Sequence, residues 1–161
     1  MRLLQQPRGL ISHPAGLEAF AREFRHAPVT VTCVTSRTRW LQLANTGVLG
    51  YVRSRDRLRV VLGPEVCQVT AKIFANPGVV SVDRAVALQV IVHELVHTTG
   101  LVDERQAERI SFTLLRSTLV RFFGYSRTGA MAMDRDAWSY HLGRSAAYQL
   151  PGVRRYTPWP E

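Results

Sequence analysis

One segment of the chain, residues 83–99, constrains the fold more than any other. Its apolar residues recur around nearly the whole circumference of a helix, so we predict that this helix lies inside the domain. Three ionisable residues, His93, Glu94 and His97, stand among them. Burying such groups costs several kcal/mol unless a partner compensates them. The segment therefore predicts either a bound cation or a satisfied polar cluster in the core, and favours the cation.

The spacing of these three residues, H-E-x-x-H, has a mechanical reason. Residues four apart lie on one face of a helix, so both imidazoles can reach one tetrahedral Zn²⁺ ion. Glu94 is rotated by about 100° from His93, which keeps it off the metal but close to a water molecule there. We therefore predict that His93 and His97 bind one zinc ion. Glu94 would take a proton from the water and pass it to a leaving amine.

A catalytic zinc ion needs a third protein ligand, which two histidines do not supply. Gly100 can end the first helix and turn the chain, so that a helix from residue 103 to about 123 folds back against it. Mirroring about this turn opposes His97 with Glu104 and His93 with Glu108. The residues alone leave three candidates for the third ligand: Asp103, Glu104 and Glu108.

The motif resembles that of the zincin metallopeptidases, whose active-site helix carries H-E-x-x-H. In the gluzincin branch, a glutamate ligand is followed four residues later by an acid that hydrogen-bonds a zinc-binding histidine. The resemblance therefore implies Glu104 as the ligand and Glu108 as the residue behind the histidine. Residues 83–112 are also similar to a compact pattern of small bacterial zincins. The excess of Arg over Lys, 20 to 1, is in keeping with a GC-rich bacterial genome.

A second resemblance within the zincins rests on Asp103. Residues 93–103 read H-E-x-x-H-x-x-G-x-x-D, similar to the snapalysin-like metzincins, in which an aspartate is the third ligand. Met131 or Met133 would then supply the methionine turn of that branch. Against this reading, Asp103 is well placed as a helix N-cap, and isolated methionines usually fill the core.

The remaining patterns predict a single α+β domain spanning residues 1–161, a minimal zincin fold. It has a small N-terminal sheet, the buried helix and C-terminal helices that close the site, and residues 150–161 form an extended tail. A length of 161 residues with 46% hydrophobic content suits one domain with its own core. Sequence patterns place helices at 15–25 and 65–74 and strands at 29–35, 40–43, 48–52 and 58–62.

The composition also bears on the compartment and excludes some classes of site. No stretch approaches the ~20 apolar residues that cross a bilayer, and the apolar start is too short for a secretory signal. We therefore predict a cytoplasmic protein that does not enter a membrane. Cys33 and Cys67 are the only cysteines, which excludes a disulfide scaffold and a cysteine-based zinc site.

Three features concern the partners. Peptidases of this kind bind the substrate backbone along an exposed strand edge, for which residues 48–52 are the candidate. They also need a donor to the oxyanion of the tetrahedral intermediate. The net charge is +9, and arginines alternate around a predicted hairpin at 53–59, so nucleic acid is a further candidate partner, as in the SprT-like zincins. The candidate oxyanion donors are Tyr125, Tyr140 and His141, and the alternating arginines are Arg53, Arg55, Arg57 and Arg59.

Two functions from different classes follow. The first is a zinc metallopeptidase that hydrolyses bonds in a peptide or protein substrate, with Glu94 activating the water. The alternative is a basic, nucleic-acid-associated binding protein whose zinc site is structural or inactive. A Glu94→Gln change separates them, because it removes the base without removing a metal ligand.

Overall fold

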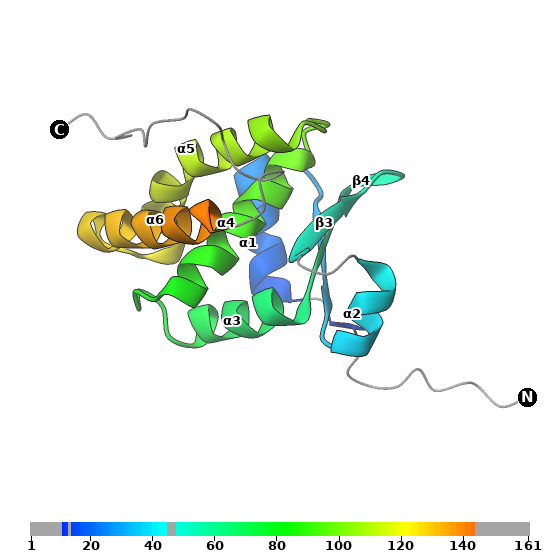
Figure 1. The fold of residues 1–161 in the computed structure, drawn as a ribbon, viewed down its shortest axis with the longest axis horizontal. Coiled ribbons are helices and arrows are strands. Elements are labelled where there is room, and N and C mark those ends of the chain that lie inside the picture. The colour runs from blue at the N-terminus through cyan, green and yellow to red at the C-terminus, as the bar shows by residue number, and fades with distance from the viewer. Residues whose placement is uncertain (1–10, 13, 45–47, 144–161) are drawn as a thin grey trace, which may run out of the picture.

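The computed structural model describes residues 11–12, 14–44 and 48–143, which form six helices and a four-stranded sheet (Figure 1). The fold is α+β, as predicted. The strands come from the N-terminal part of the chain and the longest helices follow them. The predicted tail at 150–161 lies outside the described residues.

The sheet has the strand order β1-β2-β4-β3. β2 (Thr30–Val34) and β4 (Asp56–Leu62) are parallel, whereas β1 (Ile11–Ser12) and β3 (Gly50–Arg53) pair antiparallel with their neighbours. The predicted strands at 29–35, 48–52 and 58–62 are therefore confirmed to within two residues at each boundary. Among the described residues β3 is an edge strand, which leaves one side of its backbone without a neighbouring strand.

The strand predicted at 40–43 is wrong, because this segment belongs to the short helix α2 (Arg37–Leu43). Ser36 caps the helix, and its hydroxyl accepts a hydrogen bond from the Arg39 amide at 3.2 Å. Trp40 is buried and stacks on Tyr51 of β3, with ring centroids 5.7 Å apart. A run of four residues is too short for its periodicity to separate a strand from a helix, and here the burial of one tryptophan decides.

Helix α4 (Val82–His97) lies at the centre of the molecule, between the sheet and the two C-terminal helices (Figure 1). α1 (Ala15–Arg25) and α3 (Pro64–Ala75) complete the N-terminal part. α5 (Glu104–Phe123) and α6 (Arg127–Leu142) cover the other side of α4. Twelve of the sixteen α4 residues are buried, which confirms the prediction that this helix lies inside the domain.

Two cross-links hold outer elements against this core. Arg116 of α5 and Asp134 of α6 form a buried ion pair, with Nη2 2.8 Å from Oδ2. Cys33 and Cys67 form a disulfide that joins β2 to α3, with their Cα atoms 5.8 Å apart. One such link is not a disulfide scaffold, but the pairing itself was not anticipated from the sequence. No described helix combines the length and the apolar character that a bilayer span requires.

Candidate metal centre

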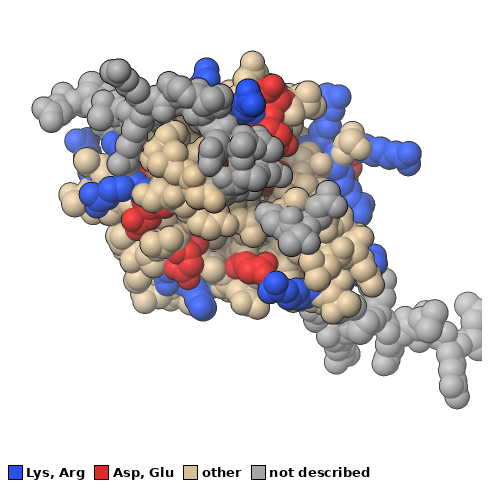
Figure 2. Space-filling model, viewed as in Figure 1, with Lys and Arg blue, Asp and Glu red and all other residues tan. Residues whose placement is uncertain are grey.

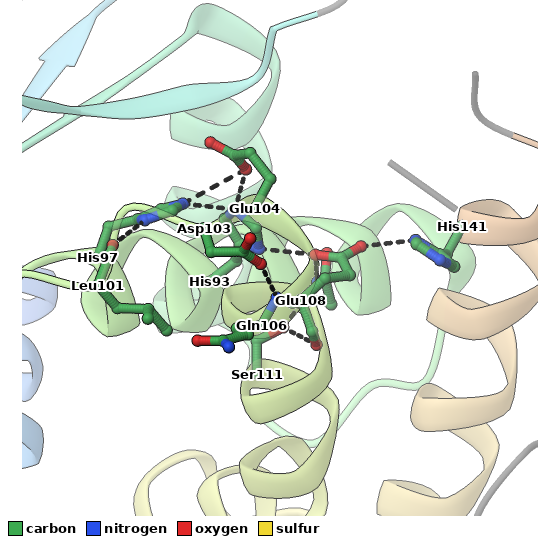
Figure 3. Close-up of polar contacts among 10 residues, drawn as sticks. His93, His97, Leu101, Asp103, Glu104, Gln106, Glu108, Ser111 and His141 are labelled. Carbon is green, nitrogen blue, oxygen red and sulfur yellow. Dashed lines mark hydrogen bonds and ion pairs between the residues drawn. The ribbon is translucent and has the colours of Figure 1, made fainter. Parts of the chain in front are cut away.

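His93 and His97 lie one turn apart near the end of α4, and their side chains meet the first residue of α5 (Figure 3). The two Nε2 atoms are 3.0 Å apart. Glu104 Oε2 lies 3.0 Å from Nε2 of His93 and 3.4 Å from Nε2 of His97. Gly100, with a φ of 95°, turns the chain between the helices in a conformation that residues with a Cβ rarely adopt. The turn therefore places a carboxylate opposite both imidazoles.

The groups nearest the two Nδ1 atoms indicate which ring nitrogens carry protons. His97 Nδ1 lies 2.6 Å from the carbonyl oxygen of Leu101, and His93 Nδ1 lies 2.6 Å from Oε2 of Glu108. Both partners are acceptors, so each Nδ1 carries the hydrogen in the neutral ring and each Nε2 presents a lone pair. Two imidazole lone pairs and a carboxylate oxygen thus point at one place. Three converging acceptors repel one another unless a metal ion or a proton lies between them.

These three side chains could hold a metal ion, since their ligand atoms all lie within 4.8 Å of one another. The other two candidates for the third ligand have different surroundings. Asp103 is the N-cap of α5, and its carboxylate accepts a hydrogen bond from the Gln106 amide at 2.7 Å. Glu108 lies behind His93, where it is almost fully buried. The structure therefore brings Glu104, and neither Asp103 nor Glu108, to both histidines.

The Glu108 carboxylate of α5 is held by partners on two other helices, α4 and α6. Besides His93, it accepts a hydrogen bond from Gln89 Nε2 at 2.9 Å, and its Oε1 lies 2.6 Å from Nδ1 of His141 on α6. Burial alone would raise its pKa, but the hydrogen bonds and charges of the two histidines lower the pKa to about 2. Glu108 is therefore an ionised carboxylate that orients His93, a role that metal-binding histidines commonly require.

When no metal ion is bound, a proton on His93 supplies the positive charge in this cluster. Burial lowers the pKa of His93, but its hydrogen bonds to Glu104 and Glu108 outweigh that effect and raise the pKa to about 10. The same contacts with His93 and His97 hold the pKa of Glu104 well below its ordinary value. The arrangement thus stabilises positive charge between the imidazoles and the carboxylates.

Glu94 is buried next to this group, on the side that faces the sheet. Burial raises the pKa of its carboxyl group to about 7, against the opposing effect of the two histidines. Its side chain packs against Gly50 of β3, where an added Cβ atom would lie 3.1 Å from Glu94 Cγ and 3.4 Å from Oε1. The edge strand therefore approaches the carboxylate closely because residue 50 has no side chain.

An open cavity of about 420 Å³ joins these residues to β3. One wall is the strand and its hairpin, the other is the loop after α4, and the two histidines, Glu94 and Glu104 lie between them. The segment predicted to bind a substrate backbone, residues 48–52, forms part of this wall. The hairpin also contributes two residues whose place was not foreseen, Arg53 and Arg57.

The predicted oxyanion donors are not in the cavity wall. Tyr125 is buried and its hydroxyl donates to the Val79 carbonyl at 3.0 Å, while His141 is buried against Glu108. These two side chains are enclosed among the helices, so the structure does not bring them to the cavity. Tyr140 is 43% exposed on α6 and does not line the cavity either.

The prediction that Met131 or Met133 forms the methionine turn of the metzincins is wrong. Met131 and Met133 both lie within the regular backbone of α6, the first exposed and the second fully buried in the core. His141 could have been placed from the sequence, because it continues the buried stripe of α6 at helical spacing. That stripe consists of Ala130, Met133, Ala137 and His141.

Comparison with known proteins identifies no relative: no protein-family profile, no curated protein and no solved structure matches this chain. The chemistry of the centre is therefore inferred from the arrangement of its own residues.

Proposed function

We propose that this protein is a zinc-dependent metallopeptidase of the zincin type that hydrolyses bonds in a peptide or protein substrate. One observation carries the proposal. Nε2 of His93, Nε2 of His97 and Oε2 of Glu104 converge inside an open cavity, with the buried carboxylate of Glu94 beside them. Two imidazole nitrogens, one carboxylate oxygen and access for solvent are the donor set of a catalytic zinc site.

The donor types favour zinc over other common cations. Imidazole nitrogen suits zinc, whereas magnesium and calcium prefer a shell of oxygen atoms. Zinc bound here would supply Lewis acidity that lowers the pKa of a water molecule. The contacts of His93 with Glu108 and of His97 with Leu101 keep both Nε2 atoms directed at the site.

Glu94 has the properties of the proton carrier. It lines the cavity but is not one of the three converging ligands, so its carboxylate is available to a reacting group. A pKa of about 7 lets the group both accept and release a proton near neutral pH. Glu94 would take the proton of the attacking water and deliver it to the nitrogen of the leaving amine.

The edge strand β3 supports a peptide as the substrate. β3 pairs with β4 along one side, in the register Gly50↔Leu62 to Val52↔Val60, and its other side has no partner strand among the described residues. An extended peptide can hydrogen-bond such an edge as an additional strand. Because Gly50 lies against Glu94, a peptide on this edge would pass beside the carboxylate.

The proposal is tested by metal removal. The zinc-loaded protein is expected to cleave an unstructured protein such as casein, to stop when a chelator removes the metal, and to resume when zinc is restored. The melting temperature should fall with the chelator, since a ligand bound only by the native state stabilises it. Cleavage that persists without metal, or a zinc-loaded protein that cuts no unfolded protein or peptide, would contradict the proposal.

Zinc binding is also expected to release protons. In the metal-free protein the pKa of His93 is about 10, so the ring is protonated at pH 7 and must lose that proton to bind a metal. Zinc affinity should therefore increase about tenfold per pH unit for this group as the pH rises towards 10. Calorimetric titrations in buffers of different ionisation enthalpy measure the proton count, and a count near zero at pH 7 would contradict this expectation.

The same shift in the pKa of His93 affects the metal-free fold. Because the pKa is raised in the folded state, its contribution to stability is complete below the ordinary value of 6.5. That contribution is lost as the pH rises through about 10. High pH therefore strengthens metal binding and weakens the fold without metal.

A further inference from the structure

One end of the cavity is basic. Arg53 is the last residue of β3, Arg57 lies near the start of β4, and both line the cavity that contains His97 and Glu104. A Cβ atom added to Gly100 would lie 3.2 Å from Nη1 of Arg57, so this guanidinium group reaches across to the loop after α4. Figure 2 shows basic side chains over the β3–β4 hairpin.

The two guanidinium groups have no acidic partner among the described residues. Arg59, in the same hairpin, pairs with Asp56 at 3.0 Å, which engages the hairpin's acidic residue. Of the carboxylates that line the cavity, Glu104 is in contact with the histidines and Glu94 is buried. Arg53 and Arg57 thus bring two positive charges to the cavity that nothing in its described walls neutralises.

We infer that this cavity selects peptides with an acidic side chain next to the cleaved bond, and that Arg53 and Arg57 recognise this side chain. The inference rests on the proposed function and adds the substrate class. Side chains of a strand alternate between its two faces, so a peptide along β3 presents some of its side chains to the hairpin end of the cavity. A glutamate or aspartate there meets guanidinium groups that can bind it in bidentate geometry.

A peptide explains the positions of these arginines better than a nucleic acid does. A nucleic-acid surface would use the alternating arginines of the hairpin together, as one basic patch. The structure instead divides them: Arg59 is paired with Asp56, Arg55 does not line the cavity, and the other two do. Two charges within a cleft beside the metal ligands match a short acidic group.

The test compares two fluorogenic peptides that differ only in Glu or Gln beside the cleaved bond. Cleavage sites mapped in casein define the rest of their sequence. The wild-type protein is expected to show a kcat/KM about five- to tenfold higher for the Glu peptide at low salt, as for one or two solvent-accessible charge pairs. The preference should fall to about one in the Arg53→Gln/Arg57→Gln double variant and persist in the matched control Arg55→Gln.

Binding provides a readout that does not depend on cleavage. The zinc-loaded Glu94→Gln protein is mixed with two extended peptides of one fixed sequence that differ only in a central Glu or Gln, labelled for fluorescence anisotropy, with and without the two arginine changes. Tighter binding of the Glu peptide that requires Arg53 and Arg57 supports the inference even if no peptide is ever cut, which would count only against the peptidase proposal.

Two results would overturn the inference. Equal cleavage and equal binding of the Glu and Gln peptides would show that the arginines do not select an acidic side chain. The peptidase proposal would then still be supported by the cleavage itself. A single-stranded oligonucleotide that displaces both peptides equally, and loses affinity when Arg53 and Arg57 are changed, would assign these arginines to nucleic acid instead.

Discussion

Replacing Glu94 with glutamine is expected to reduce casein cleavage by about 10²- to 10⁴-fold, the range that a general acid–base group contributes. The amide has nearly the same shape, so it fits the space beside Gly50, but it cannot accept a proton from water. It also carries no charge, which suits a site where burial already raises the pKa of the carboxyl group to about 7. Initial rates with equal amounts of zinc-loaded protein give the measurement.

The informative feature of this variant is what it leaves unchanged. Glu94 is not among the three converging ligands, so zinc content should stay at one ion per chain and the melting temperature should not fall. Glu23→Gln, an exposed carboxylate on α1, is the matched control for the loss of a negative charge and should keep full activity. A Glu94→Gln protein with a tenth or more of the wild-type rate would mean that another group is the base.

The sequence predicts the centre of this molecule better than its periphery. The position of α4 follows from an apolar pattern that no surface helix would carry, and two histidines four apart leave little freedom in how they face a common ion. The sequence alone does not decide among the acidic residues after the turn, because their positions depend on how a loop of six residues rotates one helix against another. The spacing of Glu104 and Glu108 favours Glu104 because it resembles the gluzincin pattern. The packing of α5 on α4 places the Glu104 carboxylate at the histidines.

Other features depend on contacts between distant segments, which no local pattern contains. The short helix α2 is stabilised by Trp40, which packs against Val61 and Tyr51 from two later strands. His141 meets Glu108 across a separation that only the packing of α6 closes. The disulfide between Cys33 and Cys67 joins residues 34 apart. In each case tertiary structure adds a neighbour that the surrounding sequence does not specify.

Replacing Glu104 with alanine is expected to empty the metal centre. The change removes one of the three converging ligand atoms and leaves two imidazoles, which do not hold a catalytic zinc alone. The loss of zinc affinity should exceed the roughly 10- to 100-fold loss that follows removal of an outer-shell partner. Because Glu104 is partly exposed and lies in the first turn of α5, the fold should survive the change. Competition with a chelating dye measures the affinity.

Two neighbouring variants show whether the loss is specific to the ligand. Glu108→Ala should weaken zinc binding by about 10- to 100-fold and also lower the stability, because it leaves buried His93 and His141 without their shared carboxylate. Asp103→Ala should keep zinc and cost about 1 kcal/mol, the usual effect of losing a helix N-cap. If Asp103→Ala or Glu108→Ala emptied the site while Glu104→Ala retained zinc, the ligand set proposed here would be wrong. The three carboxylates lie within six residues of one another, yet removing each is expected to have a different effect. Glu104 faces both imidazoles, Glu108 lies behind the ring of His93, and Asp103 caps α5.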